Sequence, residues 1–188
     1  MKSKKPGSVR IIGGEWRGTR LPVPDLPGLR PSGDRSRETL FNWLQMNIRG
    51  SRCADLFAGS GALGLEAASR GAAEVILIEN ANPAARLIAQ SLKRLNAECV
   101  ELVQSDAMAW LESCAPESLD IVFIDPPFDC GLEVRSLALL EAGNCVSANG
   151  FVYIETARES SAFTPGSGWE IVQEKTLGEV RMMLLKKN

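Results

Sequence analysis

The sequence predicts an α/β fold: a doubly wound, mostly parallel sheet that ends in an antiparallel hairpin. From residue 52 onward, short continuous apolar runs alternate with segments of helical periodicity. This pattern is typical of parallel strands that are covered by helices on both faces. The last two apolar runs are separated only by Thr176-Leu177-Gly178. Because a parallel return needs a crossover of about a dozen residues, these two strands are expected to be antiparallel.

The N-terminal segment predicts a small extension of the sheet domain. Residues 9–12 and 15–17 are expected to pair as a β-hairpin around a Gly-Gly turn. Residues 21–31 contain four prolines and predict an extended connector. A helix is then expected over about residues 34–47, with Asp34 as its N-cap. Its apolar stripe consists of Leu40, Phe41, Leu44 and Ile48.

The rest of the chain supplies the strands and helices of the sheet. The apolar runs that predict parallel strands are residues 53–57, 75–79, 99–103, 121–125 and 151–155. The segments that predict helices are residues 61–70, 82–95, 106–114 and 132–141. The two closing runs are residues 169–175 and 179–186. A parallel sheet that closes with an antiparallel pair favours the methyltransferase variant of the Rossmann architecture over the dehydrogenases.

Composition excludes several kinds of chemistry. The 188 residues include 45% hydrophobic residues, five cysteines and no histidine. Without histidine there is no Ser-His-Asp triad, no Cys-His dyad and no His general base or metal ligand. The odd cysteine count without CxxC spacing favours free thiols in a reduced compartment. No signal peptide and no membrane-spanning run is evident, so we expect a cytoplasmic protein without membrane or metal partners.

The formal net charge of -2 conceals an asymmetry. Residues 1–50 carry ten Lys or Arg and four acids, whereas the remaining 138 residues carry eleven basic and nineteen acidic residues. A basic arm on an acidic body suggests a polyanionic partner, although a solvated terminal segment also explains it.

A glycine-rich loop follows the first predicted strand of the sheet. Gly59, Gly61 and Gly64 satisfy GxGxxG between a strand and a helix, and Glu79 ends the next strand 20 residues after Gly59. A carboxylate at that place accepts hydrogen bonds from a ribose diol, so the pattern predicts a nucleoside cofactor. The alternative is a tight turn without a ligand. The candidate cofactor-binding residues are Asp55, Phe57, Ala58, Gly59, Ser60, Gly61, Glu79, Asn80, Asp106, Ala107 and Met108.

The acids around this loop favour S-adenosylmethionine over a dinucleotide. Asp55, four residues before Gly59, would repel a pyrophosphate but would pair with a cationic amino-acid group. Asp106 is expected to accept a hydrogen bond from the adenine amino group, and Met108 is expected to lie against the adenine ring. Asp106 also fits the N-cap of a helix, and both roles are compatible.

The sequence Asp125-Pro126-Pro127-Phe128 follows the fourth apolar run. Two prolines after a buried strand fix an extended loop. The Asp125 carboxylate and the Pro126 carbonyl are expected to accept hydrogen bonds from an exocyclic amino group. Phe128 is expected to stack on an extruded base. These four residues are the candidate catalytic residues for amino methylation. The alternative is an acid in a proline turn.

The sequence resembles the RsmD family, the bacterial 16S ribosomal RNA guanine-N2 methyltransferases. The matching stretches are Arg10 to Gly18, Gly28 to Pro31, Asp34 to Leu44, Asp55 to Ala67, and Asp125 to Phe128. The resemblance implies a Rossmann-like class I S-adenosylmethionine-dependent methyltransferase that modifies one guanine in the small ribosomal subunit. Cys53-Ala54, Glu79-Asn80 and Ser32-Gly33 are departures from the usual pattern of the family.

The basic arm is then expected to dock RNA. Residues 1–33 form the docking hairpin and connector, and residues 34–188 form the methyltransferase domain of a monomer. Arginines neutralise phosphates and an indole stacks on a splayed base. The candidate RNA-binding residues are Arg10, Trp16, Arg17, Arg20, Arg30, Arg35 and Arg37. The alternatives are that Arg37 pairs with a neighbouring acid on its helix and that Trp16 packs the hairpin on the body. Two other functions remain open: an adenine-N6 methyltransferase that acts on DNA, and a non-catalytic RNA-binding or assembly protein.

Overall fold

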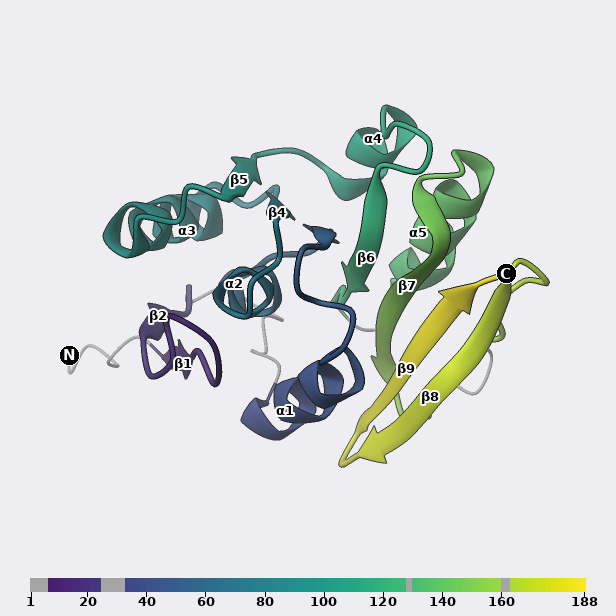
Figure 1. The fold of residues 1–188 in the computed structure, drawn as a ribbon, viewed down its shortest axis with the longest axis horizontal. Coiled ribbons are helices and arrows are strands. Elements are labelled where there is room, and N and C mark those ends of the chain that lie inside the picture. Colours follow the sequence, from purple (N-terminus) through teal and green to yellow (C-terminus); the bar gives the residue numbers. More distant parts are fainter. Residues whose placement is uncertain (1–6, 25–32, 128–129, 160–162) are drawn as a thin grey trace.

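A seven-stranded sheet forms the centre of the molecule (Figure 1). The computed structural model describes residues 7–24, 33–127, 130–159 and 163–188. The strands lie in the order β5-β4-β3-β6-β7-β9-β8. The parallel strands are β3 (Arg52–Asp55), β4 (Glu74–Ile78), β5 (Val100–Val103), β6 (Leu119–Ile124) and β7 (Val146–Ala157). The strands β8 (Trp169–Leu177) and β9 (Val180–Lys187) form the antiparallel hairpin beside β7, which confirms the predicted fold class.

Helices cover both faces of this sheet. The helices are α1 (Asp34–Trp43), α2 (Ala62–Ser69), α3 (Asn82–Leu95), α4 (Ala107–Glu112) and α5 (Leu132–Ala142). Buried side chains of α1, α2 and α3 share one hydrophobic cluster, and those of α4 and α5 share the other. The sheet is therefore the middle of three layers.

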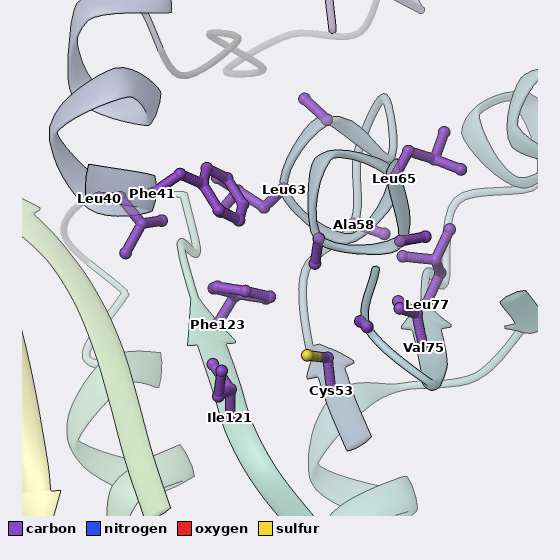
Figure 2. Close-up of a cluster of buried hydrophobic side chains, with 14 of the residues drawn as sticks. Leu40, Phe41, Cys53, Ala58, Leu63, Leu65, Val75, Leu77, Ile121 and Phe123 are labelled. Carbon is purple, nitrogen blue, oxygen red and sulfur yellow. The ribbon is translucent and has the colours of Figure 1, made fainter. Parts of the chain in front are cut away.

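The two clusters use alternate residues of the same strands. In β6, Ile121 and Phe123 join the cluster of α1 and α2, whereas Val122 and Ile124 join the other cluster. Figure 2 shows Phe123 beside Phe41 of α1, and their ring centroids are 6.0 Å apart. Because successive side chains of a strand point to opposite faces, a sheet buried on both faces requires the continuous apolar runs seen in the sequence.

The ends of α1 differ from the sequence prediction. The helix α1 ends at Trp43 and not near residue 47, because the backbone N–H groups of Asn47 and Ile48 both donate to the Leu44 carbonyl in a terminating turn. Asp34 is the first residue of α1, and Gly33 occupies the N-cap position. Asp34 instead pairs with Arg37 one turn later.

The N-terminal hairpin exists, but its second strand lies elsewhere than predicted. The strand β1 (Ser8–Arg10) pairs with β2 (Arg20–Pro22), and not with residues 15–17. The loop between them closes through the N–H of Ile11, which donates to the Thr19 carbonyl. Inside the loop, the N–H groups of Ile12 and Gly13 donate to the side chain of Glu66 in α2, so they are not available to a partner strand.

The hairpin packs into the core of the sheet domain. Val9, Ile11, Leu21 and Val23 are buried in the cluster that also contains α1 and α2. None of the helices in the described ranges combines the length and apolar character that crossing a membrane requires.

Candidate active site

Acidic side chains gather where the parallel strands end. Asp55 is the last residue of β3, Glu79 follows β4 and Asp125 follows β6. Because these strands are parallel and adjacent, their carboxyl ends share one edge of the sheet. This is the edge at which open α/β sheets bind ligands.

Glu79 organises the glycine loop between β3 and α2. One oxygen, Oε2, accepts the N–H of Gly59 at 2.7 Å, and the other, Oε1, accepts the N–H of Ala81 at 2.7 Å. Gly59 and Gly61 have φ values of 56° and 76°, in the left-handed region that favours glycine. Each carboxylate oxygen retains a lone pair, so Glu79 holds the loop and still offers acceptors to a diol.

The third glycine of the motif serves helix packing. A Cβ atom on Gly64 would lie 2.1 Å from Cδ2 of Leu77 and 3.1 Å from Cγ1 of Val75. The helix α2 therefore approaches β4 more closely than any side chain at this position would allow.

Asp55 carries the clearest sign of a cationic ligand. Its side chain is 1% exposed, and Oδ2 accepts the N–H of Gly64 at 3.0 Å. The other oxygen, Oδ1, is buried and has no hydrogen-bond partner. Burial raises the pKa of Asp55 to about 7, and the nearby charges of Asp125 and Glu79 act in the same direction. A buried unpaired acceptor among acids fits the ammonium group of S-adenosylmethionine, which would satisfy Oδ1 and restore the charged carboxylate.

The residues after β5 form the start of α4. Asp106 caps α4 by accepting the N–H groups of Met108 at 2.9 Å and Ala109 at 3.1 Å. Its side chain is exposed, whereas Ala107 and Met108 are buried in the cluster beneath α4. The N-cap role is therefore present, and the exposed carboxylate keeps further acceptor capacity.

The remaining predicted cofactor-binding residues surround the glycine loop. Ala58, Gly59, Ser60 and Gly61 are buried, Phe57 is half-buried and Asn80 is exposed. The N–H of Ala58 donates to the Ile78 carbonyl at 3.0 Å, which joins the loop to the end of β4.

The predicted catalytic motif follows β6 directly. Asp125 is half-buried, Pro126 is buried and Pro127 is exposed. The prolines end the strand because they lack the N–H that a ladder requires. Phe128 lies outside the described residues.

A buried acid that the sequence reasoning missed lies beside Asp125. Glu155 of β7 is 4% exposed and its Oε1 accepts the hydroxyl of Tyr153 at 2.5 Å. Burial, together with the charge of Asp125 and a hydrogen bond to it, raises the pKa of Glu155 to about 8. The available signal was that Glu155, like Glu79, closes an apolar run.

Four of the predicted RNA-binding arginines lie at the surface. Arg10, Arg17, Arg20 and Arg35 are exposed, and Nη2 of Arg10 lies 3.8 Å from Oδ2 of Asp34. Trp16 is half-buried against the core. Arg30 lies outside the described residues.

The prediction for Arg37 is wrong. Its side chain is fully buried, and it pairs with Asp34 at 2.6 Å and with Glu66 at 3.4 Å. A guanidinium with no exposed surface does not reach a phosphate, so Arg37 connects α1 to α2 within the protein.

The raised pKa values predict that the cofactor-free protein loses stability as the pH rises. Asp55 and Glu155 titrate near 7 and 8 when folded, against ordinary values of 3.8 and 4.5. Between these limits the folded state binds more protons than the unfolded chain, so the free energy of unfolding falls with increasing pH. We expect the thermal midpoint to decrease from pH 5 to pH 8.5, and Asp55→Asn to reduce that decrease. A midpoint that rises over this range would contradict the assignment.

Described residues contain no group of three or more His, Cys, Asp or Glu side chains that is arranged to hold a metal ion.

We compared the sequence with models of protein families and with known proteins. The family model described as "Conserved hypothetical protein 95" matches residues 9–186. Ribosomal RNA small subunit methyltransferase D of Escherichia coli (strain K12) is 44% identical over 190 residues, which cover 98% of this chain and 95% of the relative. The protein of that name from Haemophilus influenzae is 41% identical over 181 residues, which cover 95% and 93%.

Solved structures agree with this result. The putative methyltransferase yhhF from Escherichia coli has a TM-score of 0.89 and 42% identity, and the match covers 97% of this chain and 99% of that chain. The putative methylase HI0767 from Haemophilus influenzae has a TM-score of 0.82 and 37% identity, with coverage of 96% and 99%. The chain therefore belongs to the ribosomal RNA small subunit methyltransferase D family.

Proposed function

We propose that this protein transfers a methyl group from S-adenosylmethionine to the exocyclic N2 amino group of one guanine in the 16S RNA of the small ribosomal subunit. The chain is an S-adenosylmethionine-dependent methyltransferase of its family. The observation that carries the proposal is the position of Asp125-Pro126-Pro127, which follows β6 at the sheet edge shared with the glycine loop. Two acceptors beside a cofactor loop suit the methylation of an amine.

The cofactor supplies a methyl group that is activated by a sulfonium centre. Asp55 would bind its ammonium group through the unpaired Oδ1, and Glu79 would accept the ribose hydroxyls. Asp106 would accept from the adenine amino group through its exposed carboxylate, with Met108 against the ring. The backbone of residues 57–61 and Asn80 would complete the binding site.

Asp125 and Pro126 prepare the amine for attack. The lone pair of a guanine N2 nitrogen is delocalised into the base, so the free amine is a weak nucleophile. When the Asp125 carboxylate and the Pro126 carbonyl accept hydrogen bonds from its two N–H groups, the nitrogen is held pyramidal with its lone pair toward the methyl group. Asp125 would take the proton that the nitrogen releases when it accepts the methyl group supplied by the cofactor. Positioning and electrostatic stabilisation supply the acceleration.

Residues 1–33 would dock the RNA, and residues 34–188 would carry the chemistry. The exposed Arg10, Arg17, Arg20 and Arg35 offer contacts to phosphates. The half-buried Trp16 has partial exposure for stacking. Arg30 and Phe128 are proposed for phosphate contact and base stacking from the sequence alone. We further propose that the protein acts as a monomer in the cytoplasm.

Replacing Arg10, Arg17 and Arg20 together by glutamine should weaken RNA binding and flatten its dependence on salt. Each phosphate contact to single-stranded RNA contributes about 0.7 to the slope of log K against log salt, so the slope should fall by about 2. Fluorescence anisotropy with a fragment of 16S RNA measures the slope. The matched control changes the exposed Arg135, Arg158 and Lys175, which belong to other parts of the surface. An equal slope in both triple variants would show that the arm does not contact phosphates.

Mass-spectrometric mapping of ribosomal RNA in cells with and without this protein tests the function. One methylated guanine of 16S RNA should lose its N2 methyl group in the deletion strain and regain it on complementation. An unchanged methylation map would contradict the proposal. Methyl transfer to duplex DNA by the purified protein would support the adenine methyltransferase instead, and failure to bind S-adenosylmethionine would support a non-catalytic assembly protein.

A further inference from the structure

Glu155 is a buried acid that the reaction described above does not use. Ile154 of β7 lies opposite Ile124 of β6, so Glu155 and Asp125 are the next residues along two adjacent parallel strands. Glu155 is on the same face of the sheet as Tyr153, which is fully buried. The site thus places a second carboxyl group next to the proposed catalytic one.

Within the described ranges, Glu155 is accompanied by another acid, Asp125. None of the salt bridges found in the described ranges includes Glu155. On the neighbouring β9, the residue opposite is the apolar Met182. The ionisable groups that act on Glu155 are Asp125, which also hydrogen-bonds to it, and Tyr153. Farther along the edge, the charge of Asp125 also acts on Asp55.

Two carboxyl groups in hydrogen-bond contact need one proton between them, because two adjacent buried charges repel strongly. Glu155 is the better place for that proton, since it is 4% exposed whereas Asp125 is only half-buried. Tyr153 occupies Oε1 of Glu155 as a donor, and burial keeps the pKa of Tyr153 well above 10. The proton of Glu155 therefore points along the contact with Asp125.

We propose that Glu155 is a positioning residue for the proposed methyl transfer: it retains its proton, donates it to Asp125, and thereby holds Asp125 as an ionised acceptor in a fixed orientation. This inference rests on the proposed function. The Asp125 carboxylate, oriented by Glu155, would then accept a hydrogen bond from the amino group of the base. The hydrogen bonds then run in one direction: Tyr153 donates to Glu155, and Glu155 donates to Asp125.

This arrangement makes activity fall on the alkaline side. The pKa of Glu155 is raised to about 8, so the proton is present at neutral pH and is lost as the pH rises through that value. Two repelling carboxylates then replace a donor and an acceptor, and Asp125 loses its orientation. The hydrogen bond from Tyr153 lowers the pKa of Glu155, so its removal should move this loss to higher pH.

The test is the pH dependence of kcat for four proteins: wild type, Glu155→Gln, Glu155→Leu and Tyr153→Phe. Small ribosomal subunits isolated from a deletion strain are the substrate. Glutamine keeps a donor that does not titrate, so Glu155→Gln should retain kcat at pH 7 within about threefold and should lack the alkaline decline. Leucine removes the donor and should lower kcat about 10²-fold, the scale of a misplaced reacting group, with KM little changed. Tyr153→Phe should shift the decline upward in pH.

A spectroscopic readout separates this inference from the proposed function. Protein labelled with ¹³C at the glutamate carboxyl carbons should show one resonance that titrates near pH 8 in the wild type, moves in Tyr153→Phe and is missing in Glu155→Gln. If the wild type titrates in this way but modifies no ribosomal subunit, the proposed function fails and the shared proton stands. If all glutamates titrate in the ordinary range, or if Glu155→Gln retains the alkaline decline, the inference is overturned. Should Glu155→Gln not fold, wild type and Tyr153→Phe still decide the outcome through the shift of the resonance.

Discussion

Replacing Asp125 by alanine should abolish methyl transfer and leave S-adenosylmethionine binding nearly unchanged. In the proposed mechanism the carboxylate is the acceptor that holds the amino nitrogen and takes its proton, and such groups contribute about 10²- to 10⁴-fold to rate. The residues proposed for the cofactor, Asp55 and Glu79, keep their own hydrogen bonds to Gly64 and to the loop. Single-turnover transfer from labelled cofactor, combined with calorimetric binding, measures both quantities.

A graded series sharpens this experiment. Asp125→Asn keeps one carbonyl acceptor but loses the charge and the proton acceptor, so its activity should lie between those of the wild type and the alanine variant. Asp120→Ala is the matched control, because Asp120 is the second residue of the same strand, near its other end, and pairs with Arg52. That variant should be less stable but should keep its kcat when assayed well below its thermal midpoint. Full activity in Asp125→Ala would exclude the proposed mechanism.

Asp125→Ala also tests the electrostatic picture independently of catalysis. The charge of Asp125 raises the pKa of both Asp55 and Glu155. Its removal should lower both values and make the cofactor-free protein less sensitive to pH between 5 and 8.5. The raised pKa values of Asp55 and Glu155 mean that the folded protein without ligands is less stable at high pH, a cost that the proposed binding of a cationic cofactor would offset.

The order of strands and helices was predictable because two local signals agreed. Apolar runs of strand length predict strands buried on both faces, and the short link before β9 requires an antiparallel pair. The hairpin register was not predictable, because the N–H groups of Ile12 and Gly13 donate to Glu66, more than 50 residues away. A local sequence pattern cannot indicate a hydrogen-bond acceptor that lies so far away along the chain.

The acids of the site were predictable where a motif accompanied them. Asp55, Glu79 and Asp125 each end or follow an apolar run, and parallel strands bring such residues to one edge. Glu155 has the same position after its run but no flanking glycine or proline, so it looked like an ordinary strand residue. For Arg37 the alternative of a neighbouring acid on its own helix was the correct one, since Asp34 pairs with it, but the second acid, Glu66, lies in another helix and was not predictable.

The largest loss of stability is expected for Glu66→Ala. Glu66 is fully buried in α2, and its two oxygens hold groups from three parts of the chain. Oε2 accepts the N–H of Ile12 at 2.7 Å and lies 3.4 Å from Nη1 of Arg37, and Oε1 accepts the N–H of Gly13 at 2.7 Å and Nε of Arg70 at 2.8 Å. Removing one partner of a buried ion pair typically costs about 3–5 kcal/mol, because the remaining charge stays buried without compensation. Two backbone donors also lose their acceptor.

The region in which stability is lost distinguishes a broken local contact from a weakening of the whole fold. Residues 8–23 depend on Glu66 for the attachment of their loop, whereas the strands β3, β4 and β6 have their own ladders. In Glu66→Ala, hydrogen exchange should therefore accelerate most in residues 8–23, and urea unfolding should show the lower stability. Glu38→Ala, which removes an exposed acid from α1, is the control and should change neither measurement. Unchanged exchange in residues 8–23 would mean that Ser69, which accepts the N–H of Trp16 and donates to the Gly13 carbonyl, is sufficient to hold the loop.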